Sequence, residues 1–278
     1  MQLDSPARAR FEALLAEPVL RLDEAALALA AEEYPGLDVR ACLDRLDDLA
    51  ERVKRRVGDD ARMASLISAV RDVLYKEEGF RGNEKDYYDA RNSYLNQVLE
   101  RRLGIPITLS LLFMEVGRRA GLPLAGVGFP GHFLVKLELG YGRELYIDAY
   151  NEGELLSADE CKARFRHLVH GREFDGRFLQ SVPPRQLLAR MLHNLKKIYV
   201  EQGDDVRAFW VIDRLLLLHP DAMDEVRDRG LVEARLGLKP AAARDLAAYL
   251  AHAPPGAADL GEVRELLESI RAHPAMLN

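Results

Sequence analysis

The stretch RRLGIPITLSLLFMEVGRRAGLP, residues 101–123, predicts a buried central helix with sharply defined ends. Pro106 suits the first helical position because the N–H that proline lacks would have no partner there. Gly121 suits the left-handed position that follows a helix, and Pro123 prevents the helix from continuing. Apolar side chains cover nearly the whole circumference between these ends, so the helix should lie inside a domain.

An antiparallel hairpin is predicted after this helix. GHFLVKLEL alternates apolar and polar residues, GYG at 140–142 reverses the chain, and RELYIDAYN returns. A three-residue loop would place Leu139 opposite Arg143 and Leu134 opposite Asp148. His132 and Asp148 would then lie on one face, about 7 Å apart by typical sheet geometry. Such a pair suits either the base and orienter of a nucleophilic triad or a structural hydrogen bond.

The C-terminal third contains a repeat of 34 residues, which is the tetratricopeptide period. Glycine, alanine and proline recur where such helices turn, touch closely and end. The recurring pairs are Gly203 and Gly237, Ala208 and Ala242, Leu216 and Leu250, and Pro220 and Pro254. An amphipathic pattern in ADLGEVRELLESIRAH, residues 258–273, predicts a capping helix after the second repeat.

Long apolar and alanine-rich runs predict helices in the N-terminal region, including one from Asp38 to Val57. Cys42 lies on the apolar stripe of that helix, which favours a packing role. Cys161 follows a capping box in LLSADECKARF and would lie in the first turns of another helix. It is therefore a candidate nucleophile, although its apolar stripe with Phe165 favours burial.

The segment between these regions, FRGNEKDYYDARNSYLNQVLERR, residues 80–102, is rich in tyrosine, asparagine and serine. Such side chains either cap helices and tie loops together or face a ligand, and the sequence leaves both readings open. The candidate cleft-binding residues are Tyr87, Tyr88, Asn92, Ser93, Asn96, Arg102, Pro106, Thr108 and Asn151.

Composition excludes several function classes. A net charge of −6, from 39 basic and 45 acidic residues, disfavours sequence-independent nucleic-acid binding. No apolar run approaches the roughly 20 residues that span a bilayer, and a cytoplasmic protein with two reduced cysteines is expected. The histidines are dispersed and no obvious ligand set accompanies them, so neither a metal nor a cofactor is expected.

A helix that ends in Gly-Leu-Pro, then a strand with His, then a strand with Asp, resembles the transglutaminase-like, papain-related core. More specifically, the block from GNEKDYYDARNSYLNQ to GRRAGLP, with GFPGHFLVKL, YIDAYNEG and the repeats, resembles a bacterial family described as regulators of sirC expression. A similar block occurs in a eukaryotic F-box protein.

The resemblance implies an α+β fold with three parts. These are an N-terminal helical region (1–78), a transglutaminase-like core with a small antiparallel sheet (79–183), and two tetratricopeptide-like repeats with a capping helix (184–278).

Active members of the wider superfamily carry a Cys-His-Asp triad, and His132 and Asp148 match two of its members. The cysteine position falls at or next to Pro106, and no thiol lies within 101–123. Thr108 and Ser110 have hydroxyls nearby, but a hydroxyl is a far poorer nucleophile without a closely placed base.

The missing thiol favours a non-catalytic transglutaminase-like protein in a regulatory role. It would bind a protein or peptide partner through the repeats or the central cleft, without direct contact with nucleic acid or membrane. The alternative is a hydrolase or acyl transferase that uses His132 and Asp148 with an unrecognised nucleophile or an activated water.

Overall fold

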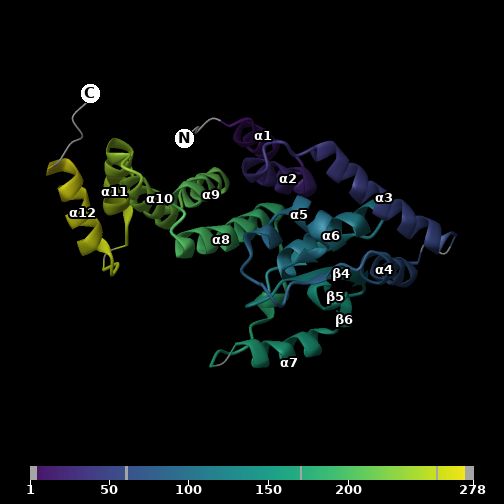
Figure 1. The fold of residues 1–278 in the computed structure, drawn as a ribbon. Coiled ribbons are helices and arrows are strands. Elements are labelled where there is room, and N and C mark those ends of the chain that lie inside the picture. The colour runs from purple at the N-terminus through teal and green to yellow at the C-terminus, as the bar shows by residue number, and fades with distance from the viewer. Residues whose placement is uncertain (1–4, 60–61, 170, 255, 273–278) are drawn as a thin grey trace. The chain divides into compact units, whose positions relative to one another are not determined.

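The computed structural model describes residues 5–59, 62–169, 171–254 and 256–272. The chain divides into two compact units, one ending at Met191 and the other beginning at Leu192. Figure 1 labels the α-helices of both units and strands β4, β5 and β6.

The first unit begins with a helical region, as predicted. Asp38 caps α3, accepting a hydrogen bond from the Ala41 N–H at 2.9 Å. Tyr75 lies in a one-turn π-helix, a form that often marks functional sites. The elements are α1 (Pro6–Leu15), α2 (Leu22–Glu33), α3 (Val39–Val57), α4 (Met63–Arg71) and the π-helix Asp72–Glu77.

The central helix forms where the sequence predicts it. A 3-10 turn (Ala90–Ser93) and α5 (Leu95–Arg101) precede α6 (Pro106–Arg119). Pro106 occupies the first turn of α6, and Gly121 follows its end with φ of 102°. Most of α6 is buried and packs against strands β3 and β4.

The first unit contains a five-stranded antiparallel sheet with the order β6-β5-β4-β3-β7. Within the described residues, a separate parallel pair joins β1 (Arg81–Gly82) to β2 (Leu103–Gly104). The strands of the sheet are β3 (Leu124–Val127), β4 (Leu134–Gly140), β5 (Arg143–Asp148), β6 (Glu154–Leu156) and β7 (Ser181–Val182).

The predicted hairpin register is confirmed along the strands but is wrong at the turn. Val135 pairs with Ile147, as expected, whereas Arg143 pairs with Gly140 and not with Leu139. A bulge between Glu138 and Gly140 absorbs the difference. Tyr141 and Gly142 both have positive φ, so two residues close a tight turn where three were expected.

Helix α7 (Ala158–Leu168) covers part of the sheet. Its predicted capping box is present: Ser157 Oγ accepts a hydrogen bond from the Glu160 N–H, and Glu160 accepts one from the Ser157 N–H. Cys161 and Phe165 pack into a buried cluster with Tyr146 of β5.

The second unit consists of paired helices, as the repeat predicts. Gly203 and Gly237 end the first helix of each pair with φ of 69° and 75°. Ala208 and Ala242 are fully buried in the second helices, where close approach needs a small residue. The helices are α8 (Pro184–Gln202, whose first residues belong to the first unit), α9 (Asp205–Leu218), α10 (Met223–Arg235), α11 (Lys239–His252) and α12 (Leu260–Ala272).

Helix α12 caps the array with buried Val263, Leu267 and Ile270, as the amphipathic pattern predicts. Among the helices of the described residues, none is long and apolar enough to cross a membrane.

Candidate functional site

His132 and Asp148 meet at the open end of the hairpin. His132 Nε2 lies 2.8 Å from Asp148 Oδ1. Asp148 is fully buried at the end of β5, and the His132 side chain is 11% exposed. The strand pairing that the sequence predicts therefore brings the imidazole and the carboxylate into direct hydrogen-bond contact.

Asp148 accepts hydrogen bonds from donors on three segments. Besides His132, the backbone N–H groups of Tyr150 and Asn151 reach Oδ1 at 3.2 Å. Oδ2 accepts from Asn151 Nδ2 at 2.8 Å and pairs with the guanidinium of Arg164 on α7. Burial alone would raise the pKa of Asp148, but these donors outweigh it and hold the pKa below its ordinary value.

This arrangement fixes the tautomer of His132. An ionised carboxylate can only accept, so the proton of the neutral ring lies on Nε2. Nδ1 is then the proton acceptor, and within the described part of the chain it has no hydrogen-bond partner. The pair could orient a general base, provided that a nucleophile lies within reach of Nδ1.

The start of α6 offers no such nucleophile. Pro106, Thr108 and Ser110 are all buried. Thr108 Oγ1 accepts from the Ile105 N–H at 3.1 Å and lies 2.7 Å from the Asn92 carbonyl oxygen, to which it donates. Ser110 Oγ faces the Phe133 carbonyl oxygen at 3.5 Å. These hydroxyls tie α6 to neighbouring segments.

The two cysteines are free and lie on α3 and α7, not on α6. Cys161 is fully buried, and burial raises the pKa of its thiol to about 12. Burial also raises the pKa of the half-buried Cys42 on α3. Since the thiolate is the reactive form, neither is prepared for nucleophilic attack at neutral pH.

The candidate cleft residues do not gather on one surface. Asn92 is fully buried and donates to the carbonyl oxygens of Asp86 and Tyr87, while accepting from Asn83 at 3.0 Å. Ser93 and Asn96 are also buried, and Ser93 Oγ and Asn96 Oδ1 have no hydrogen-bond partner among the described residues. These three candidates therefore lie in the interior of the first unit.

The other candidates reach the surface. Tyr87 and Tyr88 are 39% and 58% exposed, and their rings meet edge to face at 5.3 Å. Arg102 adopts a left-handed conformation after α5 and points toward Glu78. Asn151 lines a hollow of about 570 Å³ beside β1, together with Tyr150.

Sequence reasoning missed three residues that shape this region. Arg164 pairs with Asp148, Tyr75 donates to the Ala149 carbonyl oxygen at 3.0 Å, and Arg190 donates to the His132 carbonyl oxygen at 2.6 Å. Each lies on a helix outside the hairpin. The capping box before Arg164 predicts that α7 begins there, but not that it packs against β5.

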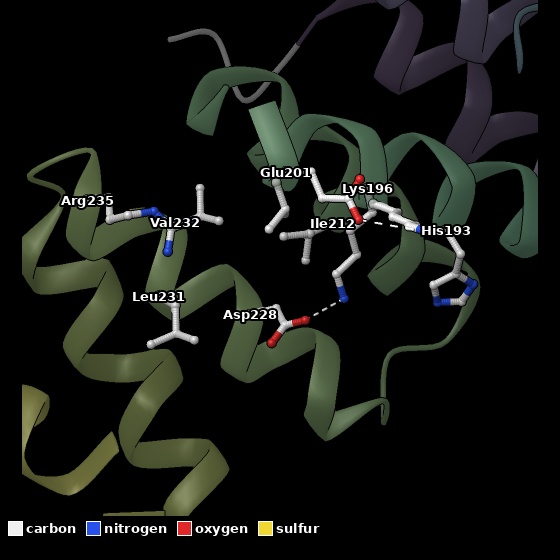
Figure 2. A pocket seen from close by; sticks show the side chains of 10 residues that line it. His193, Lys196, Glu201, Ile212, Asp228, Leu231, Val232 and Arg235 are labelled. Atoms are coloured by element: carbon white, nitrogen blue, oxygen red, sulfur yellow. Dashed lines mark ion pairs between the residues drawn. The ribbon is translucent and has the colours of Figure 1, made fainter. Parts of the chain in front are cut away.

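A second hollow, of about 330 Å³, lies within the second unit (Figure 2). Apolar side chains from α8, α9 and α10 line it, namely Val200, Ile212, Leu231 and Val232. Lys196 reaches across from α8 to Asp228 of α10 at 2.5 Å, as Figure 2 shows. We call this hollow the repeat groove.

No group of three His, Cys, Asp or Glu side chains suited to a metal ion occurs among the residues that the structure describes. The hairpin presents an oriented imidazole, and the repeat groove presents apolar side chains beside paired charges.

Comparison with known proteins relates the chain to established families. The transglutaminase-like superfamily matches residues 40–193, and a tetratricopeptide-repeat family matches residues 195–268. No solved structure matches the chain.

Several relatives are similar over much of the chain. A UPF0162 protein of Xylella fastidiosa is 40% identical over 84% of this chain and 84% of that protein. A UPF0162 protein of Vibrio cholerae is 30% identical over 84% of this chain and 87% of its own length. F-box only protein 21 of Homo sapiens is 34% identical over 62% of this chain, but over only 28% of that protein. The chain therefore belongs to the transglutaminase-like superfamily, with tetratricopeptide repeats in its C-terminal part and UPF0162 proteins among its relatives.

Proposed function

We propose that this protein binds a protein or peptide partner in a regulatory role and performs no covalent catalysis. The start of α6 carries the proposal. It holds Pro106 where the superfamily cysteine is expected, it is buried, and its two hydroxyls bond to neighbouring backbone. Covalent catalysis needs an activated nucleophile, so the His132–Asp148 pair alone cannot supply it.

The repeat groove is the proposed partner-binding surface. Its apolar floor and paired charges suit a peptide segment, because buried apolar contacts supply affinity while the polar rim orients the chain. Stacked helical repeats commonly present such concave surfaces. Regulation of expression, as the sirC-regulator description suggests, would then act through the partner. We place this role in the cytoplasm, which the two free cysteines support.

The groove is tested by selecting binders from a random peptide display library on the full-length chain. Val200 is 45% exposed in the groove, and Val206 is 55% exposed on α9 outside it. We expect selected peptides to lose binding to Val200→Glu and to keep binding to the matched control Val206→Glu. Selection of no peptide, or equal binding to both variants, would contradict the proposal.

A second candidate is a hydrolase or acyl transferase, because His132 Nδ1 is left open as a proton acceptor. Turnover of a panel of aryl esters and peptide amides by the purified chain and by His132→Ala separates the two functions. The binding function predicts no activity that the substitution removes. Turnover lost in a folded His132→Ala variant would establish the enzyme.

A further inference from the structure

Arg190, in the part of α8 that belongs to the first unit, holds the loop that carries His132. Its Nη2 donates to the carbonyl oxygens of Phe129 at 2.9 Å and of His132 at 2.6 Å. Its guanidinium carbon lies 5.4 Å from the centre of the Phe133 ring. A Cβ at Gly128 would come within 3.3 Å of Nη1, so this glycine leaves room for the guanidinium.

The charge of Arg190 has no counter-ion in the part of the chain that the structure describes. Two other half-buried arginines of the same unit each contact carboxylates: Arg119 contacts Asp23, Asp47 and Glu115, and Arg164 contacts Asp148 and Glu154. Arg190 bonds only to neutral carbonyl oxygens, and burial lowers its pKa. Covering a cation without a nearby anion costs free energy, which an incoming anion would recover.

Aromatic rings also lie beside His132, whose carbonyl oxygen Arg190 holds. The Tyr87 ring lies 6.4 Å from that of Tyr150. Tyr150 in turn meets the His132 ring edge to face at 6.0 Å. Tyr87 and Tyr88 are both exposed, and exposed aromatic clusters are typical of ligand-binding surfaces.

We propose that Arg190 and Tyr87, beside His132, bind a carboxylate presented by an acidic peptide. Two of the five guanidinium N–H groups bond to the carbonyl oxygens, and the others can form charge-assisted hydrogen bonds to the carboxylate. Tyr88 and Tyr150 would cover the neighbouring peptide residues. This site lies in the first unit and stands independently of the repeat groove.

The probes for the test are the peptide acetyl-Gly-Glu-Gly-Glu-Gly-amide, its glutamine counterpart and sodium acetate, titrated against the full-length chain. We expect the glutamate peptide to bind at least about tenfold more tightly than the glutamine peptide. Arg190→Gln should remove that preference. Arg185→Gln makes the same charge change on α8, where Arg185 donates to the Leu15 carbonyl oxygen, and should preserve it.

Equal affinity for the two peptides, or equal losses in the two variants, would overturn the proposal. Competition by acetate at the concentration at which the peptide itself competes would assign the site to small carboxylates and overturn the peptide assignment.

A measurement on the wild-type protein tests the site even if Arg190→Gln does not fold. In chain labelled with [15N]arginine, one guanidinium signal should shift saturably with the glutamate peptide, and that signal should be missing from Arg190→Lys. Small linear shifts of many arginine signals would show non-specific binding and contradict the site.

Discussion

Asp148 and Glu233 are both buried carboxylates, one in each compact unit. They differ in how many hydrogen-bond donors surround them. Asp148 accepts hydrogen bonds from His132, Asn151 and Arg164, and its pKa lies below the ordinary value. Glu233 on α10 has an Oε2 atom without a partner in the described residues. Burial and the nearby Asp245 raise its pKa to about 7. The hydrogen-bond donors around each carboxylate, and not burial, decide which of the two stays charged.

The transglutaminase-like core surrounds Asp148 with donors but places no reactive group at the start of α6. The hairpin maintains an ionised, oriented Asp148 with five hydrogen-bond contacts, whereas the start of α6 supplies no nucleophile. The protein therefore stabilises the His132–Asp148 pair as part of its architecture. The pair also shapes the surface beside Arg190.

Removing Asp148 should have the largest effect. Asp148→Ala removes the buried acceptor shared by His132, Asn151 and one Arg164 amino group, while the Arg164 contact with Glu154 remains. We therefore expect a loss of about 3–5 kcal/mol in the free energy of unfolding. Urea denaturation followed by circular dichroism measures it. Asp159→Ala, an exposed carboxylate on α7, is the control and should cost less than about 1 kcal/mol.

The pH dependence of this effect has a definite sign. Because the folded-state pKa of Asp148 is depressed, its stabilisation is present above the ordinary carboxyl pKa of 3.8 and is lost as pH falls below it. The stabilities of wild type and Asp148→Ala should converge under acid conditions. A difference that grows on acidification would contradict the ionised pair.

Glu233→Gln should stabilise the second unit at pH 8 by on the order of 2 kcal/mol. The folded-state pKa of about 7 exceeds the ordinary value of 4.5, so wild type loses stability as pH rises through that interval. Trp210, the single tryptophan, lies on α9 and reports unfolding of this unit by fluorescence.

The gain in Glu233→Gln should disappear near pH 4, where the carboxyl is protonated in both folded and unfolded chains. Glu265→Gln, at an exposed position on α12, should show no such pH dependence. If the stabilities of Glu233→Gln and Glu265→Gln depended on pH in the same way, Glu233 would be solvated.

Thr108→Val should have the smallest effect. It removes the acceptor for the Ile105 N–H and the donor to the Asn92 carbonyl oxygen, which costs about 1–2 kcal/mol. The near-isosteric change preserves packing. Hydrogen exchange should speed up at the first amides of α6 and not at those of α7. Unchanged exchange at α6 would contradict the capping role of Thr108.

Local patterns in the sequence predict much of the fold. Alternation predicts strands β4 and β5 and their pairing, Pro106 and Gly121 mark the ends of α6, and the 34-residue spacing predicts the helix pairs of the second unit. The predicted turn is one residue too long, because Tyr141 adopts a positive φ, which residues with a large side chain rarely do.

The residues around the His132–Asp148 pair could be predicted only in part. Strand parity predicts that His132 and Asp148 lie on one face, but Arg164 and Arg190 arrive through the packing of α7 and α8. No local spacing encodes such contacts, since they depend on where a helix docks. The burial of α6, in contrast, is predicted by the apolar side chains around its circumference.

We infer that an oriented His132–Asp148 pair persists without a covalent nucleophile. Intact-mass analysis after incubation with iodoacetamide, and separately with a fluorophosphonate, at pH 7 tests it most directly. We predict that no adduct depends on His132, that Cys161 stays unmodified, and that any slow labelling of Cys42 is equal in wild type and His132→Ala. A stoichiometric adduct in wild type that is absent from a folded His132→Ala variant would contradict the claim.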